Sequence, residues 1–140
     1  MDTAKDIIDT YRIKDLKRYA ADNGLRIVYP EHNQLLIDID SDEDFQTFKD
    51  QFKILSEKFK VLWTVTPSRS KPQGKHIIIT VPGANFSDLE RIAFQAVLGS
   101  DRKRELLSIF DIIKGDSHPT VFFEKEEEPN EARPKTEVIR

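Results

Sequence analysis

Acidic and aliphatic side chains alternate along residues 34–40, Gln-Leu-Leu-Ile-Asp-Ile-Asp. Alternate residues of a β-strand share a face, so the aliphatic residues are expected to face a core while Asp38 and Asp40 point together to the other side. Two carboxylates so close to each other repel unless a proton or a cation lies between them. The pattern predicts a half-buried strand that ends in a candidate Mg²⁺ or Mn²⁺ site. The alternative interpretation is a solvated strand face that runs into an acidic helix start.

Composition limits the classes of function. The chain has 140 residues, the size of one domain, and a net charge of −3, so a nucleic-acid surface would have to be a local basic patch. It has no cysteine, which excludes disulfides, thiolate metal sites and a cysteine nucleophile. No apolar run reaches the roughly 18 residues of a membrane helix, and the N-terminus lacks a signal-peptide core. We therefore expect a cytoplasmic protein with no membrane partner.

Hydrophobic spacing and turn residues divide the chain into regular elements. Ser41 is a candidate N-cap for a helix, and Ser87 with Glu90 forms a candidate capping box for another. The apolar face of the first of these helices comprises Phe45, Phe48, Phe52, Leu55 and Phe59. The helices that follow Ser87 are predicted to present Leu89, Ile92, Ala93, Ala96 and Val97, then Leu106, Leu107, Phe110 and Ile113. The predicted elements are a helix over 4–23, strands over 25–29, 34–40, 61–66, 76–81 and 119–124, and helices over 42–59, 88–98 and 102–114.

The order of these elements predicts an α+β fold with an RRM-like, or ferredoxin-like, β-α-β-β-α-β core over residues 34–124. Residues 1–33 would form an N-terminal helix-strand extension, in which residues 25–29 form either a hairpin with residues 34–40 or a strand elsewhere. Residues 125–140, charged and poor in large apolar side chains, would form a disordered tail. The usual strand order places residues 34–40 centrally, between antiparallel neighbours 76–81 and 119–124. It therefore brings His76 close to Asp38 and Asp40.

A polar loop precedes His76. Residues 68–76 contain hydroxyls, cations and a glycine, which are groups that bind phosphates, although a polar hairpin loop has a similar composition. Ser70, Arg69, Lys71 and His76 are the candidate phosphate ligands. The basic cluster Arg102-Lys103-Arg104 begins a helix, where cations oppose the helix dipole, and is a candidate contact for a nucleic-acid backbone.

Glu124 ends the last predicted core strand and is a candidate third metal ligand. Antiparallel register places it towards the far end of the strand from Asp40, so Asp116 and Asp111 compete for this role. The three histidines lack zinc-site spacing, and there is no P-loop or dinucleotide-binding glycine motif.

The hydrophobic-Asp-hydrophobic-Asp strand, the Ser-loop-His strand entry and the RRM-like order together resemble the archaeo-eukaryotic primase superfamily in a minimal form. The resemblance implies divalent metal at Asp38 and Asp40, phosphate contacts from Ser70 and His76, and completion of the metal site by the Phe-Glu pair that ends in Glu124. Ser70 and His76 are separated by five residues instead of the one of the family motif, and Glu124 replaces the more usual Asp. Residues 90–101 also resemble small replication-associated open reading frames of viral or plasmid origin.

Three functional hypotheses follow. The first is a primase-polymerase-like nucleotidyltransferase with Asp38, Asp40 and His76 as catalytic residues, a nucleoside triphosphate as substrate, a DNA or RNA template, and a replication-protein partner. The second is a non-catalytic RRM-like module of a mobile-element replication system that binds nucleic acid or protein. The third is a metal-dependent phosphodiesterase or nuclease, because the same acidic pair activates water.

Overall fold

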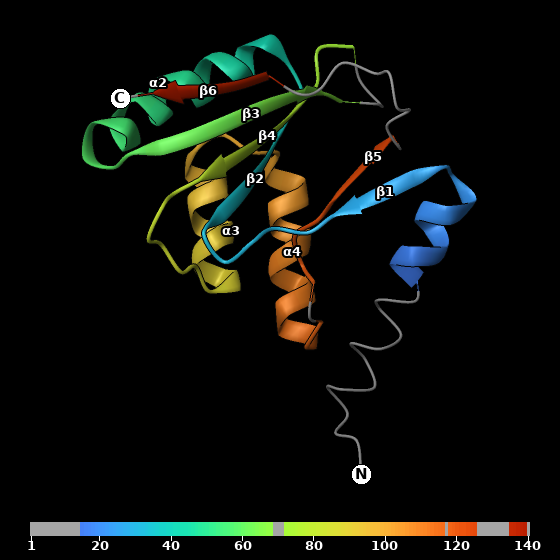
Figure 1. Cartoon of the computed structure of the whole chain (residues 1–140). Coiled ribbons are helices and arrows are strands. Elements are labelled where there is room, and N and C mark those ends of the chain that lie inside the picture. Colours follow the sequence, from blue (N-terminus) through green and yellow to red (C-terminus); the bar gives the residue numbers. More distant parts are fainter. Residues whose placement is uncertain (1–14, 69–71, 117, 126–134, 140) are drawn as a thin grey trace.

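The computed structural model has an α+β fold with two antiparallel sheets (Figure 1). It describes residues 15–68, 72–116 and 118–125, together with the backbone of residues 135–139. The larger sheet has the strand order β2-β4-β3-β6, and the smaller sheet pairs β1 with β5. The strands are β1 (Leu25–Val28), β2 (Gln34–Ile39), β3 (Val61–Pro67), β4 (Lys75–Thr80), β5 (Phe122–Lys125) and β6 (Lys135–Ile139). The helices are α2 (Asp42–Lys58), α3 (Asp88–Val97) and α4 (Arg102–Lys114), and residues 15–22 are also helical.

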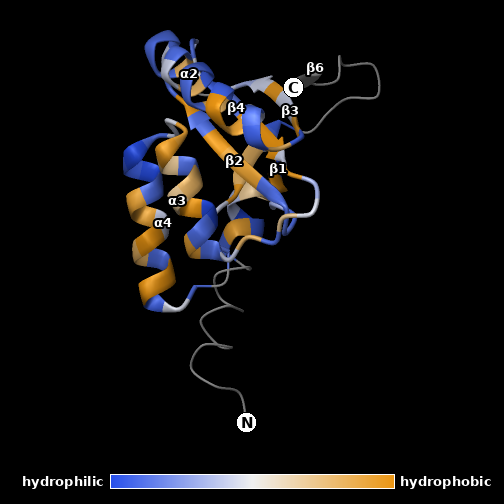
Figure 2. Cartoon of the chain, turned by 90° about the vertical axis from the view of Figure 1, so that its left-hand side faces the viewer, coloured by the Kyte–Doolittle hydropathy of each residue, from blue (hydrophilic) through white to orange (hydrophobic). Residues whose placement is uncertain are grey.

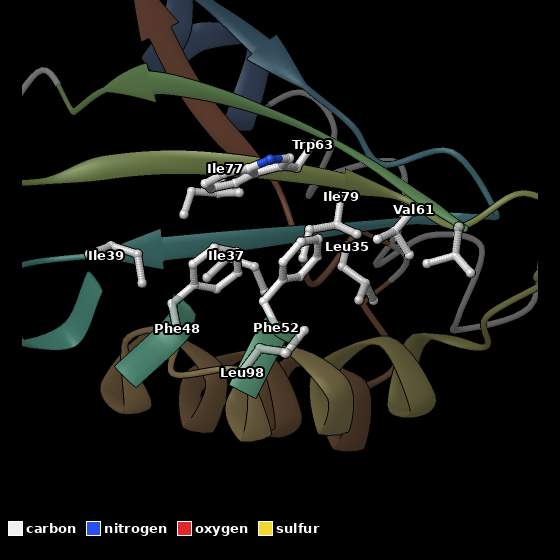
Figure 3. Packing of buried hydrophobic residues seen from close by; sticks show 11 residues of the cluster. Leu35, Ile37, Ile39, Phe48, Phe52, Val61, Trp63, Ile77, Ile79 and Leu98 are labelled. Carbon is white, nitrogen blue, oxygen red and sulfur yellow. The ribbon is translucent and has the colours of Figure 1, made fainter. Parts of the chain in front are cut away.

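Helix α2 covers one face of the larger sheet and forms the main core with it. Phe48 and Phe52 are fully or almost fully buried and stack at a centroid separation of 5.3 Å, and Trp63 of β3 lies 5.5 Å from the Phe48 ring. Figure 3 shows the rings of Phe48 and Phe52 in the layer between helix and sheet, near Leu35 and Ile37 of β2. The alternation predicted for residues 34–40 is confirmed, because Leu35, Ile37 and Ile39 are completely buried on this face.

Helix α2 begins where the sequence predicts. The Ser41 hydroxyl accepts from the backbone N–H of Asp44 at 3.1 Å, which satisfies one of the unpaired amides of the first turn. Of the predicted apolar stripe, Phe59 falls outside the core and is 56% exposed, because the helix has ended at Lys58 and the chain there is extended. The cap thus fixes the helix immediately after Asp40.

The predicted strand order is correct for three strands and wrong for the fourth. Strand β4 lies between β2 and β3, as expected for an RRM-like core. Strand β5 does not join β2; it pairs with β1, with Arg26 opposite Glu124. The hairpin between β1 and β2 therefore does not form, and β2 is an edge strand of its sheet.

Polar side chains of α3 and α4 occupy the edge of β2 that β5 was expected to cover. Arg91 Nε donates to the carbonyl of Gln34 at 2.9 Å, and Arg104 Nη1 donates to the carbonyl of Leu36 at 2.7 Å. The N–H of Leu36 donates to Gln95 Oε1 at 2.8 Å. Buried backbone groups must find partners, and here side chains replace the missing strand. We call the residues of α3, α4 and their connecting turn that bind this edge the edge cap: Arg91, Gln95, Ser100, Asp101 and Arg104.

The two cap helices bury polar residues and expose apolar ones. Gln95 and Glu105 are 0% and 2% exposed, and Gln95 Nε2 donates to both carboxylate oxygens of Glu105 at 3.0 Å. The capping box of Ser87 with Glu90 is confirmed, but most of the predicted apolar face is not a core face. Hydrophobic segments are visible along α3 and α4 in Figure 2. The large apolar residues that these two helices expose are Leu89, Phe94, Val97, Leu106, Leu107, Phe110 and Ile113.

The end of the chain also departs from expectation. Residues 135–139, assigned from the sequence to a disordered tail, form strand β6, which pairs antiparallel with β3. Backbone pairing with the open edge of β3 requires no apolar side chains, so composition gave no signal for it. Residues 4–14 of the predicted first helix lie outside the described residues.

Candidate metal and phosphate site

Asp38 and His76 are direct cross-strand neighbours in the register of β2 with β4. His76 Nε2 lies 3.8 Å from Asp38 Oδ1. Both side chains point to the sheet face opposite α2, because Ile37 and Ile77 beside them are buried in the main core. The predicted proximity of Asp38 and His76 is therefore confirmed.

A third acidic residue, Asp101, joins Asp38 and Asp40. Ligand oxygens from these three residues all lie within 4.8 Å of one another. Asp101 comes from the turn between α3 and α4, where its carboxylate also caps α4 by accepting from the N–H of Lys103 at 3.1 Å. Asp101 was not among the metal ligands predicted from the sequence.

The edge cap fixes this arrangement through the backbone. The N–H of Asp38 donates to Ser100 Oγ at 2.9 Å, and the N–H of Asp101 donates to the carbonyl of Asp38 at 2.8 Å. Gly99, immediately before Ser100, has φ = +91°, a conformation that glycine adopts without strain. The reversal at Gly99 turns the chain so that Ser100 and Asp101 lie along the edge of β2.

Burial raises the pKa of the Asp38 carboxyl above its usual value. Arg104 and His76 oppose this shift by favouring the charged form, while Asp40 and Asp101 reinforce it by repulsion. The largest cause is thus the burial of the carboxylate, and a cation bound beside Asp38 would offset that cost by favouring the charged form.

Glu124 lies on the other side of His76 and is not a member of the three-acid cluster. Its Oε1 is 3.5 Å from His76 Nδ1, and its Oε2 accepts from Arg26 Nη2 at 3.0 Å. The His76 imidazole and the Arg26 guanidinium hold the pKa of Glu124 below its usual value, against a smaller opposing effect of burial. Glu124, predicted as the third metal ligand, thus lies outside the cluster of Asp38, Asp40 and Asp101, because β5 pairs with β1 instead of β2.

The other predicted residues lie apart from the cluster or outside the described part of the chain. Asp116 and Asp111 are not among the clustered carboxylates. Ser70, Arg69 and Lys71 lie outside the described residues. The ends of their loop are described: the N–H of Ser68 donates to the carbonyl of Gly74 at 2.8 Å, which places the loop at the His76 end of β4.

The three basic residues at the start of α4 have two different environments. Arg104 is drawn into the edge cap, where burial lowers its pKa despite the neighbouring Glu105 and Asp38 carboxylates. Arg102 and Lys103 remain exposed beside Asp101. A groove of about 430 Å³ between α2 and the α3–α4 turn is lined by Thr47, Gln51 and Arg102, among others, and includes Asp101.

A scan against protein-family models, a search of curated proteins and a search of solved structures each found no match. Within the described residues, no helix combines the length and the apolar character needed to cross a bilayer.

Proposed function

We propose that this chain is a minimal, metal-dependent nucleotidyltransferase core of the primase-polymerase type. It binds Mg²⁺ or Mn²⁺ through Asp38, Asp40 and Asp101, and it binds a nucleoside triphosphate and a nucleic-acid template. The observation that carries the proposal is the convergence of three carboxylates on one point beside a buried histidine. Three of the four strands of an RRM-like core, in the order β2-β4-β3, support it.

The donor set fits a hard divalent cation. Oxygen ligands are those that Mg²⁺ and Mn²⁺ prefer. Two oxygens on one Mg²⁺ ion lie at most about 4.2 Å apart, since each Mg–O bond is about 2.1 Å. Oxygens of the three carboxylates lie within 4.8 Å of one another, and side-chain rotations that shorten these separations would complete the site. Bound divalent ions would supply the charge that orients the triphosphate and the attacking hydroxyl.

Candidate phosphate ligands come from β4 and from the loop that precedes it. His76 Nε2 is directed towards the Asp38 carboxylate, and the loop that contains Arg69, Ser70 and Lys71 leads into the same end of β4. Cations, hydroxyls and backbone N–H groups bind triphosphates by charge-assisted hydrogen bonds. Arg102 and Lys103, exposed beside Asp101, would contact the template backbone.

Mn²⁺ titration with and without a nucleoside triphosphate tests the proposal. The parent chain should bind Mn²⁺, and the triphosphate should tighten that binding. Asp38→Asn combined with Asp40→Asn should abolish it, whereas Asp50→Asn, which changes an exposed carboxylate of α2, should leave it unchanged. Product analysis on a primed template then separates synthesis from hydrolysis by a phosphodiesterase or nuclease. Equal Mn²⁺ binding by the parent and the double variant would overturn the proposal.

The second candidate function is a non-catalytic module that binds a replication protein or nucleic acid. The apolar side chains that α4 exposes favour it, because Leu106, Leu107, Phe110 and Ile113 are each 47–74% exposed. This reading requires no metal. A chain that binds nucleic acid equally well with Mn²⁺ and with a chelator, and that makes no product, is the outcome that selects it.

A further inference from the structure

Two alternate residues of β5 contact the same imidazole. The Phe122 ring stacks on His76 with a centroid separation of 4.1 Å and an interplanar angle of 4°. Glu124 Oε1 lies 3.5 Å from His76 Nδ1. Phe123, between them, points the other way and packs against Tyr19 at 4.8 Å. One strand therefore restrains the histidine both on its face and at one edge.

We propose that Glu124 and Phe122 are positioning residues that hold the His76 imidazole with Nε2 facing the acid cluster, where it contacts the phosphate of a bound nucleoside triphosphate. This inference rests on the proposed function and assigns Glu124 a role other than metal ligation. The smaller sheet, β1 with β5, then serves to fix one side chain of the larger sheet.

The contacts around Glu124 are built for this role. Glu124 is 7% exposed, and Arg26, its cross-strand partner, fixes the second carboxylate oxygen at 3.0 Å. The other carboxylate oxygen, Oε1, faces His76. Neither Oε1 nor His76 Nδ1 has a hydrogen-bond partner elsewhere in the described residues. A carboxylate beside one ring nitrogen selects the tautomer and the orientation of the ring. Nδ1 is thereby committed to Glu124, and Nε2 is the nitrogen that faces Asp38.

The stacked ring is itself held in place. The Arg104 guanidinium lies 4.9 Å from the centroid of the Phe122 ring, and the same guanidinium binds the carbonyl of Leu36 on β2. Phe122 is 2% exposed. A stacked, buried neighbour fixes the plane of the imidazole, and Glu124 beside Nδ1 selects between the two flipped orientations of the ring.

The test compares Glu124→Gln with Glu57→Gln, which changes an exposed glutamate of α2. The His76 ring nitrogens are observed by ¹⁵N NMR and assigned with His76→Asn; Mn²⁺ and triphosphate affinities are measured on the same samples. Glu124→Gln should alter the Nδ1 and Nε2 shifts of His76 and weaken triphosphate binding about tenfold. Mn²⁺ affinity without nucleotide should stay within about twofold of the parent. Glu57→Gln should change none of these.

Two results would overturn the inference. One is a His76 ring spectrum in Glu124→Gln identical to that of the parent. The other is a loss of Mn²⁺ affinity as large as that caused by Asp101→Asn, which would make Glu124 a metal ligand. If Glu124→Gln fails to fold, Arg26→Gln, which removes the hydrogen-bond donor to the second carboxylate oxygen of Glu124, should produce a smaller change of the same sign in the spectrum and in triphosphate affinity. If the parent chain binds no triphosphate, the proposed function fails, and the ring spectrum alone decides whether Glu124 positions His76.

Discussion

The backbone N–H of Asp101 donates to the backbone carbonyl of Asp38 at 2.8 Å. This bond joins a strand to a helix-helix turn that lies far from it in the sequence, and it brings the two carboxylates into one cluster. The bond fixes how closely the two main chains approach each other. The two carboxylates therefore start from neighbouring positions whether or not a cation is bound.

Asp101→Asn should weaken Mn²⁺ binding at least about tenfold, which corresponds to about 1.4 kcal/mol. The substitution removes one of three anionic ligands but leaves the backbone bond to Asp38 and an acceptor for the cap of α4. Isothermal titration of Mn²⁺ measures the effect. Asp116→Asn is the matched control, since Asp116 is not in the cluster. Weaker binding in Asp116→Asn with no change in Asp101→Asn would reassign the third ligand.

Asp38→Asn combined with Asp40→Asn should raise the thermal stability of the metal-free chain at pH 7, by about 3 °C in Tm. Burial and the neighbouring carboxylates raise the pKa of Asp38 in the folded state. The folded state therefore loses stability as the pH rises from the unfolded pKa, about 3.9, through the raised folded value. The gain of the variant should vanish below about pH 3.5, where the parent carboxyl is protonated in both states. Thermal melts across this range, with a chelator present, provide the comparison.

Gln95→Ala should lower the free energy of unfolding by about 3 kcal/mol, because it leaves the N–H of Leu36 without an acceptor and removes both hydrogen bonds from Gln95 Nε2 to the buried Glu105 carboxylate. Gln46→Ala removes an exposed glutamine bonded to Asp50 on α2 and should cost less than about 0.5 kcal/mol. Urea denaturation of both variants checks the contrast. Similar stabilities would mean that the edge cap adds nothing to folding.

Glu124→Gln should destabilise the chain at neutral pH and not at acid pH. His76 and Arg26 hold the folded-state pKa of Glu124 below its usual value, so its contribution is present above the unfolded pKa, about 4.3, and is lost as the pH falls through the folded value. We expect a difference from the parent of about 2 kcal/mol at pH 7, the size of a hydrogen bond to a charged group, which disappears towards about pH 3. Urea unfolding at a series of pH values measures it. A difference that is constant with pH would show that packing, and not charge, explains the effect.

Local signals in the sequence predicted the parts of the fold that local physics controls. The cap at Ser41, the box of Ser87 with Glu90, and the alternation along β2 each depend on neighbouring residues alone, and all are present in the structure. The contact between Asp38 and His76 followed from the predicted RRM-like order, in which these two strands are antiparallel neighbours, as they are in the structure.

The features that the sequence did not predict depend on which residues pack against the edge of β2. The apolar spacing of α3 and α4 identified a hydrophobic face, but spacing does not tell whether a face is buried. These helices instead bury Gln95 and Glu105, whose partners include the backbone of a distant strand. Asp101 was not predicted as a ligand, because it reaches the cluster only through the contact of the α3–α4 turn with β2. Glu124 was predicted beside the acidic pair because β5 was expected to pair with β2, whereas it pairs with β1.

The edge cap also implies a match of pitch between a helix and a strand. Arg91 and Gln95, four residues apart on α3, bind Gln34 and Leu36, two residues apart on β2. Four helical residues rise about 6 Å, and two strand residues span about 6.6 Å, so helix and strand advance almost in step. One residue inserted between Arg91 and Gln95 would rotate the later side chain by about 100° off the strand. The length of this segment is therefore constrained more tightly than its composition.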